Sequence, residues 1–221
     1  MSKREGSILR REILSQPRVL ARILAREAGR VTTLARRIRR LDPQLILVVA
    51  RGSADNAGLY GKYLFGARNR RVVALAAPSL FTQYRRPPDV GRALVLAISQ
   101  SGESHDVVEV VETARRADAL TVAVTNTPGS PLAGAVDEVL LCHAGEERSV
   151  AATKTYTAQL MLLALLSAAM AGRAAPMEAL RRVPDWVAAA LEAEPRARDV
   201  AERLRYLEQC AVVGRGYCYG T

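Results

Sequence analysis

Residues 93–104 read ALVLAISQSGES, an apolar run that passes directly into a cluster of serines. The first seven residues barely alternate between apolar and polar side chains, which is typical of a strand buried on both faces of a parallel sheet. Val107, Val110 and Val111 then recur at helical spacing. The stretch therefore predicts a buried strand, a polar loop and a helix in succession, which is one step of an α/β fold.

The same step recurs along the chain and predicts the fold class. We expect further helices to run to about residue 67 and over about 150–171. Because strands alternate with helices, the sequence predicts an α/β fold with a doubly wound, flavodoxin-like parallel sheet and helices on both faces. The other predicted strands are LILVVA (45–50), VVALAA (72–77), LTVAVT (120–125) and EVLLC (138–142).

Four segments can be distinguished by composition and periodicity. Pro17 is predicted to open a second helix near the N-terminus, since proline suits a first helical turn. CAVVG (210–214) restarts the strand pattern, and a lone strand cannot bury its faces, so we expect the natural protein to continue beyond it. The segments are an N-terminal helical lead-in (1–42), the sheet domain (43–173), a helical connector (174–208) and the start of a truncated second domain (209–221).

The positive charge is concentrated at one end of the chain. The formal net charge is +10, and residues 1–40 hold twelve Lys and Arg against three Glu, so nine of the ten net charges lie there. Such a stripe can bind polyanions, but no groove-reading motif accompanies it, and aromatic residues amount to only 5%. We therefore favour a solvated face or a subunit contact, and we expect no nucleic-acid partner.

Cysteine usage and hydropathy indicate the compartment. The three cysteines, Cys142, Cys210 and Cys218, form no C-x-x-C pair and are odd in number, which disfavours a disulfide framework. The first residues lack the apolar run of a signal peptide, and the most apolar stretch, 160–171, is shorter than the ~20 residues that a bilayer requires. We expect a soluble cytoplasmic protein that does not contact a membrane.

Hydroxyl side chains follow two of the predicted strands, where ligands bind in open parallel sheets. The first strand is followed by Gly52 and Ser53, and the third ends in a loop whose polar residues open a helix. Unsatisfied N–H groups and the positive end of the dipole at a helix start attract anions, and serine hydroxyls donate without adding charge. The polar residues and the glycine of the loop after the third strand are Ser99, Gln100, Ser101, Gly102 and Ser104.

This cluster predicts a phosphate site, although an ordinary serine N-cap is the simpler alternative. A single serine would satisfy a cap, and the cluster contains more hydroxyls than a cap requires. Gly102 would let the backbone approach a ligand closely. Neither the G-x-G-x-x-G nor the G-x-x-x-x-G-K-[ST] pattern of nucleotide-binding loops occurs, so a phosphate monoester fits better than a nucleotide.

Three motifs in order resemble the isomerase half of the glucosamine-6-phosphate synthase family and its relatives, which contain SIS (sugar isomerase) domains. EILSQPRVL (12–20) is also similar to the lead-in helix of that family, and VVGRGYCYG (212–220) to the start of its second domain. The similarity covers nearly the whole chain. The three motifs are RGSADNAG (51–58), ISQSGES (98–104) and SVAATKTYTAQL (149–160).

The resemblance implies a fold, a ligand and roles for particular residues. It implies an SIS-type domain that binds a hexose or hexosamine 6-phosphate, a homodimer, and no cofactor or metal. Val150 and Ala151 would line the sugar through their backbone, whereas Ala152 stands where many relatives have serine. The residues that would hold the phosphate and nearby sugar hydroxyls are Ser53, Ser99, Gln100, Ser101 and Ser104.

Departures from that family narrow the expected activity. The synthase begins with a glutaminase whose cysteine follows the initiator Met, whereas this chain has Ser2 there and only about forty residues before the first strand. We therefore expect an amino-sugar-phosphate isomerase or deaminase rather than glutamine-driven amino transfer. The family's catalytic residues lie in its second domain and C-terminal tail, so we expect this segment to bind its ligand without turnover.

A sugar-phosphate-sensing domain of a transcription regulator is the alternative function. The basic N-terminus motivates it, but about forty residues without a three-helix pattern are too few for a helix-turn-helix unit. The apparent second domain also argues against it.

Four other residues are weaker candidates for the site. His105 and His143 lack the partners that a catalytic triad or a zinc site would need. Glu103 would be repelled by a phosphate dianion, so we expect it to point away or to accept from backbone N–H groups. Lys154 is either a countercharge for the phosphate or a solvated lysine at a helix start.

Overall fold

Five parallel strands form the centre of the structure, a computed structural model that describes residues 7–220. The strand order is β2-β1-β3-β4-β5, and all four neighbouring pairs are parallel. The predicted doubly wound α/β sheet is therefore confirmed. Ser2 and Thr221 lie outside the described residues. The strands are β1 (Leu45–Ala50), β2 (Val72–Leu75), β3 (Leu94–Ile98), β4 (Leu120–Thr125) and β5 (Glu138–Leu141).

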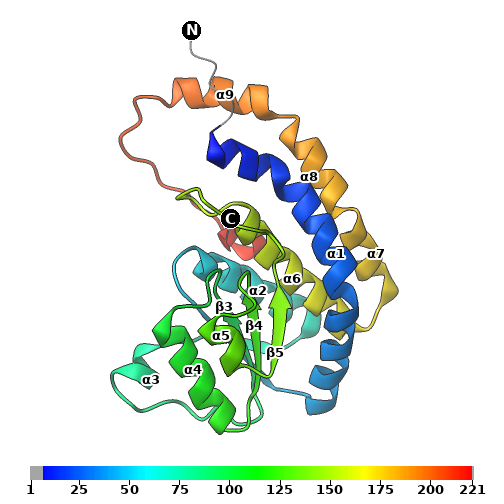
Figure 1. Cartoon of the computed structure of the whole chain (residues 1–221), viewed down its shortest axis with the longest axis vertical. Coiled ribbons are helices and arrows are strands. Elements are labelled where there is room, and N and C mark those ends of the chain that lie inside the picture. The colour runs from blue at the N-terminus through cyan, green and yellow to red at the C-terminus, as the bar shows by residue number, and fades with distance from the viewer. Residues whose placement is uncertain (1–6, 221) are drawn as a thin grey trace.

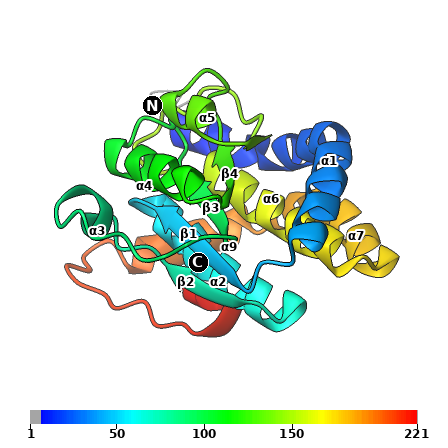
Figure 2. The ribbon, with the colours of Figure 1, turned by 90° about the horizontal axis from the view of Figure 1, so that it is seen from below.

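Helices cover both faces of the sheet, as Figures 1 and 2 show. Successive side chains of β3 enter different layers, because side chains alternate across a strand. Leu94, Leu96 and Ile98 belong to one hydrophobic core, and Val95 and Ala97 to the other. The first core is covered by α1 (Ile8–Leu41), α2 (Ser53–Asn69) and α6 (Lys154–Ala171), and the second by α3 (Ser79–Thr82), α4 (His105–Arg116) and α5 (Pro131–Ala135).

The last part of the chain returns along the first helix (Figure 1). Arg10 on α1 makes a two-pronged contact with Glu194, with Nε–Oε1 and Nη2–Oε2 distances of 2.7 and 2.8 Å. The short 3₁₀ helix η1 (Gly216–Gly220) packs against α2, where the ring centroids of Tyr60 and Tyr217 lie 6.2 Å apart. The helices of this return path are α7 (Ala174–Arg181), α8 (Val183–Leu191) and α9 (Glu194–Arg203).

Pro17 does not open a second helix, so that prediction was wrong. It lies inside α1, which runs unbroken for 34 residues from a Ser7 N-cap. A proline in a helix interior costs roughly 3 kcal/mol. Val19, Leu20 and Ile23 follow it and are all buried, and each such burial contributes about 1.5–3 kcal/mol. Packing of the apolar stripe therefore outweighs the lost hydrogen bond.

Other boundaries also differ from the sequence-based expectation. Residues 210–214 form no strand, and Val212 and Val213 are 84% and 92% exposed, because no strand among the described residues pairs with them. The segment 150–153 precedes α6 instead of belonging to it. The predicted helical connector consists of α7, α8 and α9, and Pro184 and Pro195 lie in the first turns of α8 and α9, where they favour new helix starts.

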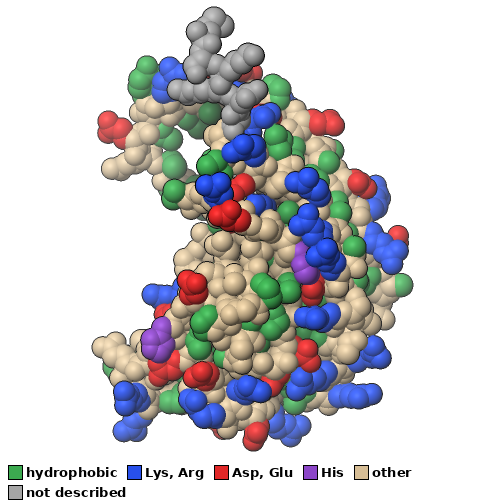
Figure 3. Space-filling view, in the orientation of Figure 1, with side chains coloured by type: hydrophobic (Ala, Val, Ile, Leu, Met, Phe, Trp, Pro, Cys, Tyr) green, Lys and Arg blue, Asp and Glu red, His purple; other side chains and the backbone are tan. Residues whose placement is uncertain are grey.

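The basic N-terminal segment is mostly one face of α1, and several of its arginines are engaged within the chain. Arg22, Arg30 and Arg39 donate to the carbonyl oxygens of His143, Val139 and Ala169 at 2.8, 2.9 and 2.6 Å, and Arg37 pairs with Glu138 at 3.1 Å. Figure 3 shows basic and acidic side chains interspersed along this side of the molecule. The charge therefore helps to dock α1, which the sequence did not indicate. Among residues 7–220, no helix combines the length and the hydropathy needed to cross a membrane.

The central strand should be the most sensitive part of the core. Leu96 on β3 is fully buried, whereas Leu14 on α1 is 41% exposed. We expect Leu96→Ala to lower the free energy of unfolding by about 2–5 kcal/mol, because it leaves a cavity. Leu14→Ala should change it by less than about 1 kcal/mol. Guanidinium unfolding followed by circular dichroism measures both, and equal effects would contradict the assigned core.

Candidate functional site

The strand order creates a crevice between β1 and β3. These strands are neighbours, yet the chain continues from β1 to β2 on one side and from β3 to β4 on the other. Loops at such a switch point diverge and leave room for a ligand. A cavity of about 230 Å³ lies there. It is lined by Arg51, Ser53, Ala54, Ser99, Gln100, Ser101, Ser104, Val150, Ala152, Thr155, Tyr156 and Gln159.

Six of the nine predicted site residues line this cavity, and three do not. Gly52 and Gly102 instead turn the chain, with φ of +62° and +68°. Gly102 is also packed so closely that an added Cβ would overlap the Ser130 side chain. Ala151 is exposed and its carbonyl accepts from Ser149 Oγ at 2.9 Å, while the next residue, Ala152, faces the cavity. The six lining residues are Ser53, Ser99, Gln100, Ser101, Ser104 and Val150.

Two serines of the loop after β3 shape the loop itself. Ser99 Oγ accepts from the N–H of Gly102 at 3.1 Å, and Ser101 Oγ accepts from the N–H of Glu103 at 3.3 Å. In each case the oxygen is the acceptor, so the hydroxyl hydrogen remains available for a ligand. These contacts hold the turn at the start of α4 in place before any ligand binds.

Ser104 occupies the N-cap position of α4 without capping it. Its side chain makes no capping hydrogen bond. Serines in the same position do cap elsewhere, since Ser7 Oγ accepts from Arg10 N at 3.2 Å and Ser130 Oγ accepts from Ala133 N at 3.3 Å. The ordinary cap therefore does not account for Ser104. The Ser104 hydroxyl therefore lines the cavity at the start of α4, where the helix dipole favours an anion.

Besides the loops after β1 and β3, helix α6 lines the cavity, and the site predicted from the sequence did not include its residues. Thr155 and Gln159 are buried polar residues one helical turn apart, and Tyr156 lies beside them. Burial raises the pKa of Tyr156, so its phenol stays protonated at neutral pH. In the sequence, Thr155 and Gln159 stand four positions apart just before an apolar run. This spacing indicates a polar patch on one face of a buried helix.

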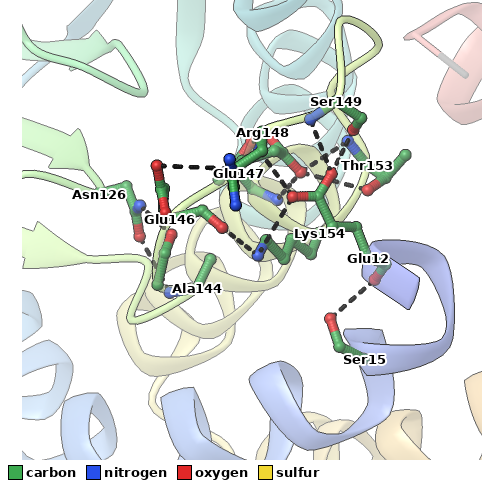
Figure 4. Close-up of polar contacts among 12 residues, drawn as sticks. Glu12, Ser15, Asn126, Ala144, Glu146, Glu147, Arg148, Ser149, Thr153 and Lys154 are labelled. Carbon is green, nitrogen blue, oxygen red and sulfur yellow. Dashed lines mark hydrogen bonds and ion pairs between the residues drawn. The ribbon is translucent and has the colours of Figure 1, made fainter. Parts of the chain in front are cut away.

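The loop that precedes α6 is fastened to α1 by a buried carboxylate (Figure 4). Glu12 accepts from the backbone N–H groups of Arg148 and Ser149 at 2.6 and 3.1 Å, and from the Ser149 hydroxyl. Its Oε1 also lies 3.6 Å from Lys154 Nζ. The Lys154 amine donates to the Glu146 carbonyl and is only 10% exposed. Lys154 is thus not solvated, so that prediction was wrong, and it is not a lining residue of the cavity.

A second carboxylate organises the start of α6. Glu147 accepts from the N–H groups of Thr153 and Thr155 at 2.9 and 3.3 Å and from both hydroxyls. Asn126 holds the other end of the loop, because its amide donates to Gly145 O at 2.8 Å and accepts from Ala144 N at 2.9 Å. Residues 144–155 are therefore held at both ends, which places Val150 and Ala152 at the cavity.

The remaining candidates lie away from the cavity. Glu103 and His105 are exposed and do not line it. His143 Nε2 lies 2.7 Å from Glu27 Oε1 on α1, which gives it a packing role. A larger cavity of about 670 Å³ lies between α1, α2, α6 and α7, lined mostly by apolar residues and arginines, and none of the predicted site residues lines it.

The contacts of Glu12 make a pH-dependent contribution to stability. Burial raises the pKa of this carboxyl, but the hydrogen bonds from Ser149 and Arg148 and the charge of Lys154 outweigh it and lower the pKa below its ordinary value of 4.5. A carboxyl whose pKa is lowered by folding stabilises the folded state, and this contribution is fully present when the pH is above the ordinary pKa of the group. The stabilisation is lost as the pH falls through the folded-state pKa.

We expect Glu12→Gln to lower the free energy of unfolding by about 1–3 kcal/mol near neutral pH. The difference from the wild type should shrink below pH 4.5, where the wild-type carboxyl also becomes neutral. Urea unfolding across this pH range measures it, with Glu178→Gln at an exposed pair with Arg181 as the control. A constant difference at every pH would show that the charge of Glu12 is not responsible.

Comparisons with known proteins agree with this fold. The family model described as SIS domain matches residues 42–169. A glutamine–fructose-6-phosphate aminotransferase (isomerizing) of Thermus thermophilus is 38% identical over 218 residues, 93% of this chain and 36% of that protein. The corresponding protein of Thermococcus kodakarensis is 33% identical over 220 residues, 96% of this chain and 36% of its own. This chain thus spans about a third of the length of these relatives.

Two solved structures are also similar. A candidate phosphosugar isomerase of Silicibacter pomeroyi has a TM-score of 0.85 and 37% identity, over 90% of this chain and 61% of that one. The C-terminal domain of a glucosamine-fructose-6-phosphate aminotransferase from Francisella tularensis has a TM-score of 0.86 over 100% of this chain and 66% of that one, with 24% identity, and shows the shared fold. With a family model over more than half its length, the chain belongs to the SIS domain family.

Proposed function

We propose that this chain binds the phosphate of a hexose or hexosamine 6-phosphate and forms part of an isomerase or deaminase of such sugars. The observation that carries the proposal is the Ser104 side chain, which sits at a helix start without capping it and faces the cavity. The Ser104 hydroxyl and the positive end of the α4 dipole would act there together on an anion. The volume of about 230 Å³ suits a ligand smaller than a typical drug.

The lining residues suggest how a sugar phosphate would be oriented. The hydroxyls of Ser53, Ser99, Ser101 and Ser104 and the amide of Gln100 would hold the phosphate from two neighbouring strand ends. The segment 150–152 and the side chains of α6 would face the sugar. Gln159 can both donate to and accept from sugar hydroxyls. The phosphate would thus be anchored at the loops while the carbon skeleton extends toward α6.

The chemistry proposed for the whole protein is proton movement between C1 and C2 of the sugar. This chain contributes binding and orientation, and the acid–base groups are proposed to come from a second domain of the family type, which we place from residue 209 onward. The reported relatives are named as aminotransferases and as an isomerase, so we do not retain the transcription-regulator alternative.

The assembly and the segment boundaries belong to the same proposal. We propose a homodimer and retain the division into residues 1–42, 43–173, 174–208 and 209–221. Trp186 and Val200 on the connector helices and Leu204 directly after α9 are exposed and offer apolar surface for a subunit or domain contact.

Replacing Ser104 separates ligand binding from helix capping. We expect Ser104→Ala to weaken binding of fructose 6-phosphate about ten- to a hundredfold in calorimetry, the equivalent of losing a hydrogen bond to a charged group. The free energy of unfolding should change by less than about 0.5 kcal/mol, because no capping bond is lost. Ser101→Ala should weaken binding similarly.

Ser7→Ala is the matched control, since Ser7 does cap its helix. It should cost about 1 kcal/mol of stability and leave the affinity unchanged. The Ser104→Ala variant could instead be less stable than the wild type and bind fructose 6-phosphate with unchanged affinity. In that case Ser104 is a helix cap and the proposed site is wrong.

A further inference from the structure

Arg51 reaches the cavity from the turn directly after β1. It is a lining residue, and its side chain is 62% exposed. Its Nε lies 3.2 Å from Oδ2 of Asp106, in the first turn of α4. The pair therefore bridges the two loops that diverge at the switch point.

The residues that line the cavity carry a net positive charge, which would attract a phosphate dianion. Among the described residues that line the cavity, Arg51 is the only one with a positive charge, and none carries a carboxylate. Lys154 does not compensate, because its amine is buried against Glu12 and the Glu146 carbonyl. The hydroxyls and helix N–H groups supply dipoles but no net charge.

The guanidinium of Arg51 also has donors to spare. Its one recorded contact within residues 7–220 is the ion pair with Asp106, which engages the Nε side of the group. A guanidinium carries five N–H donors in a planar fork that matches two oxygens of a phosphate. Such charge-assisted, two-pronged contacts are stronger than those of neutral donors.

Asp106 is placed to act on Arg51 and not directly on the ligand. Its Oδ1 accepts from the N–H of Val107 at 3.0 Å, which fixes the carboxylate to α4 with Oδ2 toward Arg51. Asp106 is not a lining residue. The negative charge of Asp106 therefore holds the Arg51 guanidinium beside the cavity. The same charge weakens the attraction of the guanidinium for an anion.

We propose that Arg51 is a phosphate-binding residue of this site, and that Asp106 positions its guanidinium and attenuates its charge. The inference rests on the proposed function and adds a specificity determinant to it. The serine loops would recognise a phosphate by shape and donors, while Arg51 would favour a doubly charged group over a neutral one.

The first test uses the full chain and replaces Arg51 with an uncharged residue. Calorimetry with fructose 6-phosphate should show Arg51→Gln binding roughly tenfold more weakly, with Arg51→Lys in between, since lysine keeps the charge but loses the fork. The salt dependence of the affinity should also become shallower in Arg51→Gln. Arg115→Gln is the matched control, because Arg115 Nε lies at the same 3.2 Å from a carboxylate, that of Asp137, away from the cavity. It should bind like the wild type.

The second test removes the charge of Asp106. Asp106→Asn should tighten binding about threefold in the wild-type background and give no gain in Arg51→Gln, as expected for two residues that act through one another. Glu112→Gln, which removes a carboxylate further along α4 that pairs with Arg116 at 4.0 Å, should have no effect in either background.

The outcomes separate the inference from the function on which it rests. If the wild type binds fructose 6-phosphate and Arg51→Gln binds equally well with the same salt dependence, Arg51 is not a phosphate residue, while the serine site stands. An equal gain from Asp106→Asn in both backgrounds would overturn the coupling of the two residues. A wild-type chain that binds neither fructose 6-phosphate nor glucosamine 6-phosphate would overturn both proposals.

Discussion

The adjacency of β1 and β3 determines where everything else in the site can lie. Their helices, α2 and α4, leave in opposite directions to opposite faces of the sheet. The two turns cannot pack against each other, so a space remains at the strand ends. Both helix starts then point their N–H groups toward that space. The anion-binding character of the cavity is thus a result of topology before any particular side chain is considered.

Two carboxylates, the buried Glu12 and the half-buried Glu147, then fix the loop that forms one side of this opening. Glu12 and Glu147 accept mainly from backbone N–H groups and hydroxyls in one loop and at one helix start. A buried charge is costly unless it is paired and fully hydrogen-bonded. Because these groups satisfy the carboxylates, the loop has one favoured path, and that path brings Val150 and Ala152 to the cavity. Positioning thus comes from charges that do not touch the cavity.

The strands and the serine loop could be predicted from the sequence because they depend on local patterns. Unbroken apolar runs identify buried strands, and the residues from Ser99 to Ser104 are contiguous. The interior position of Pro17, the burial of Lys154 and the role of Glu12 could not be predicted in this way. Each depends on a partner far along the chain, and a charged residue on a helix gives no local sign of whether water or a distant loop surrounds it. The α6 wall had a local sign in the spacing of Thr155 and Gln159, but only the fold shows that this face of α6 meets the strand ends.

The contact between Glu12 and residues 148–149 spans more than 130 positions of sequence. A ribosome releases the N-terminal helix long before the loop that its carboxylate must hold. Contacts between such distant segments form late and slow the folding of a chain. During synthesis, α1 therefore has to wait with its apolar stripe and its acidic residue uncovered until α6 has emerged. The side of the cavity that this contact fixes can therefore form only after the loop at residues 148–149 has emerged.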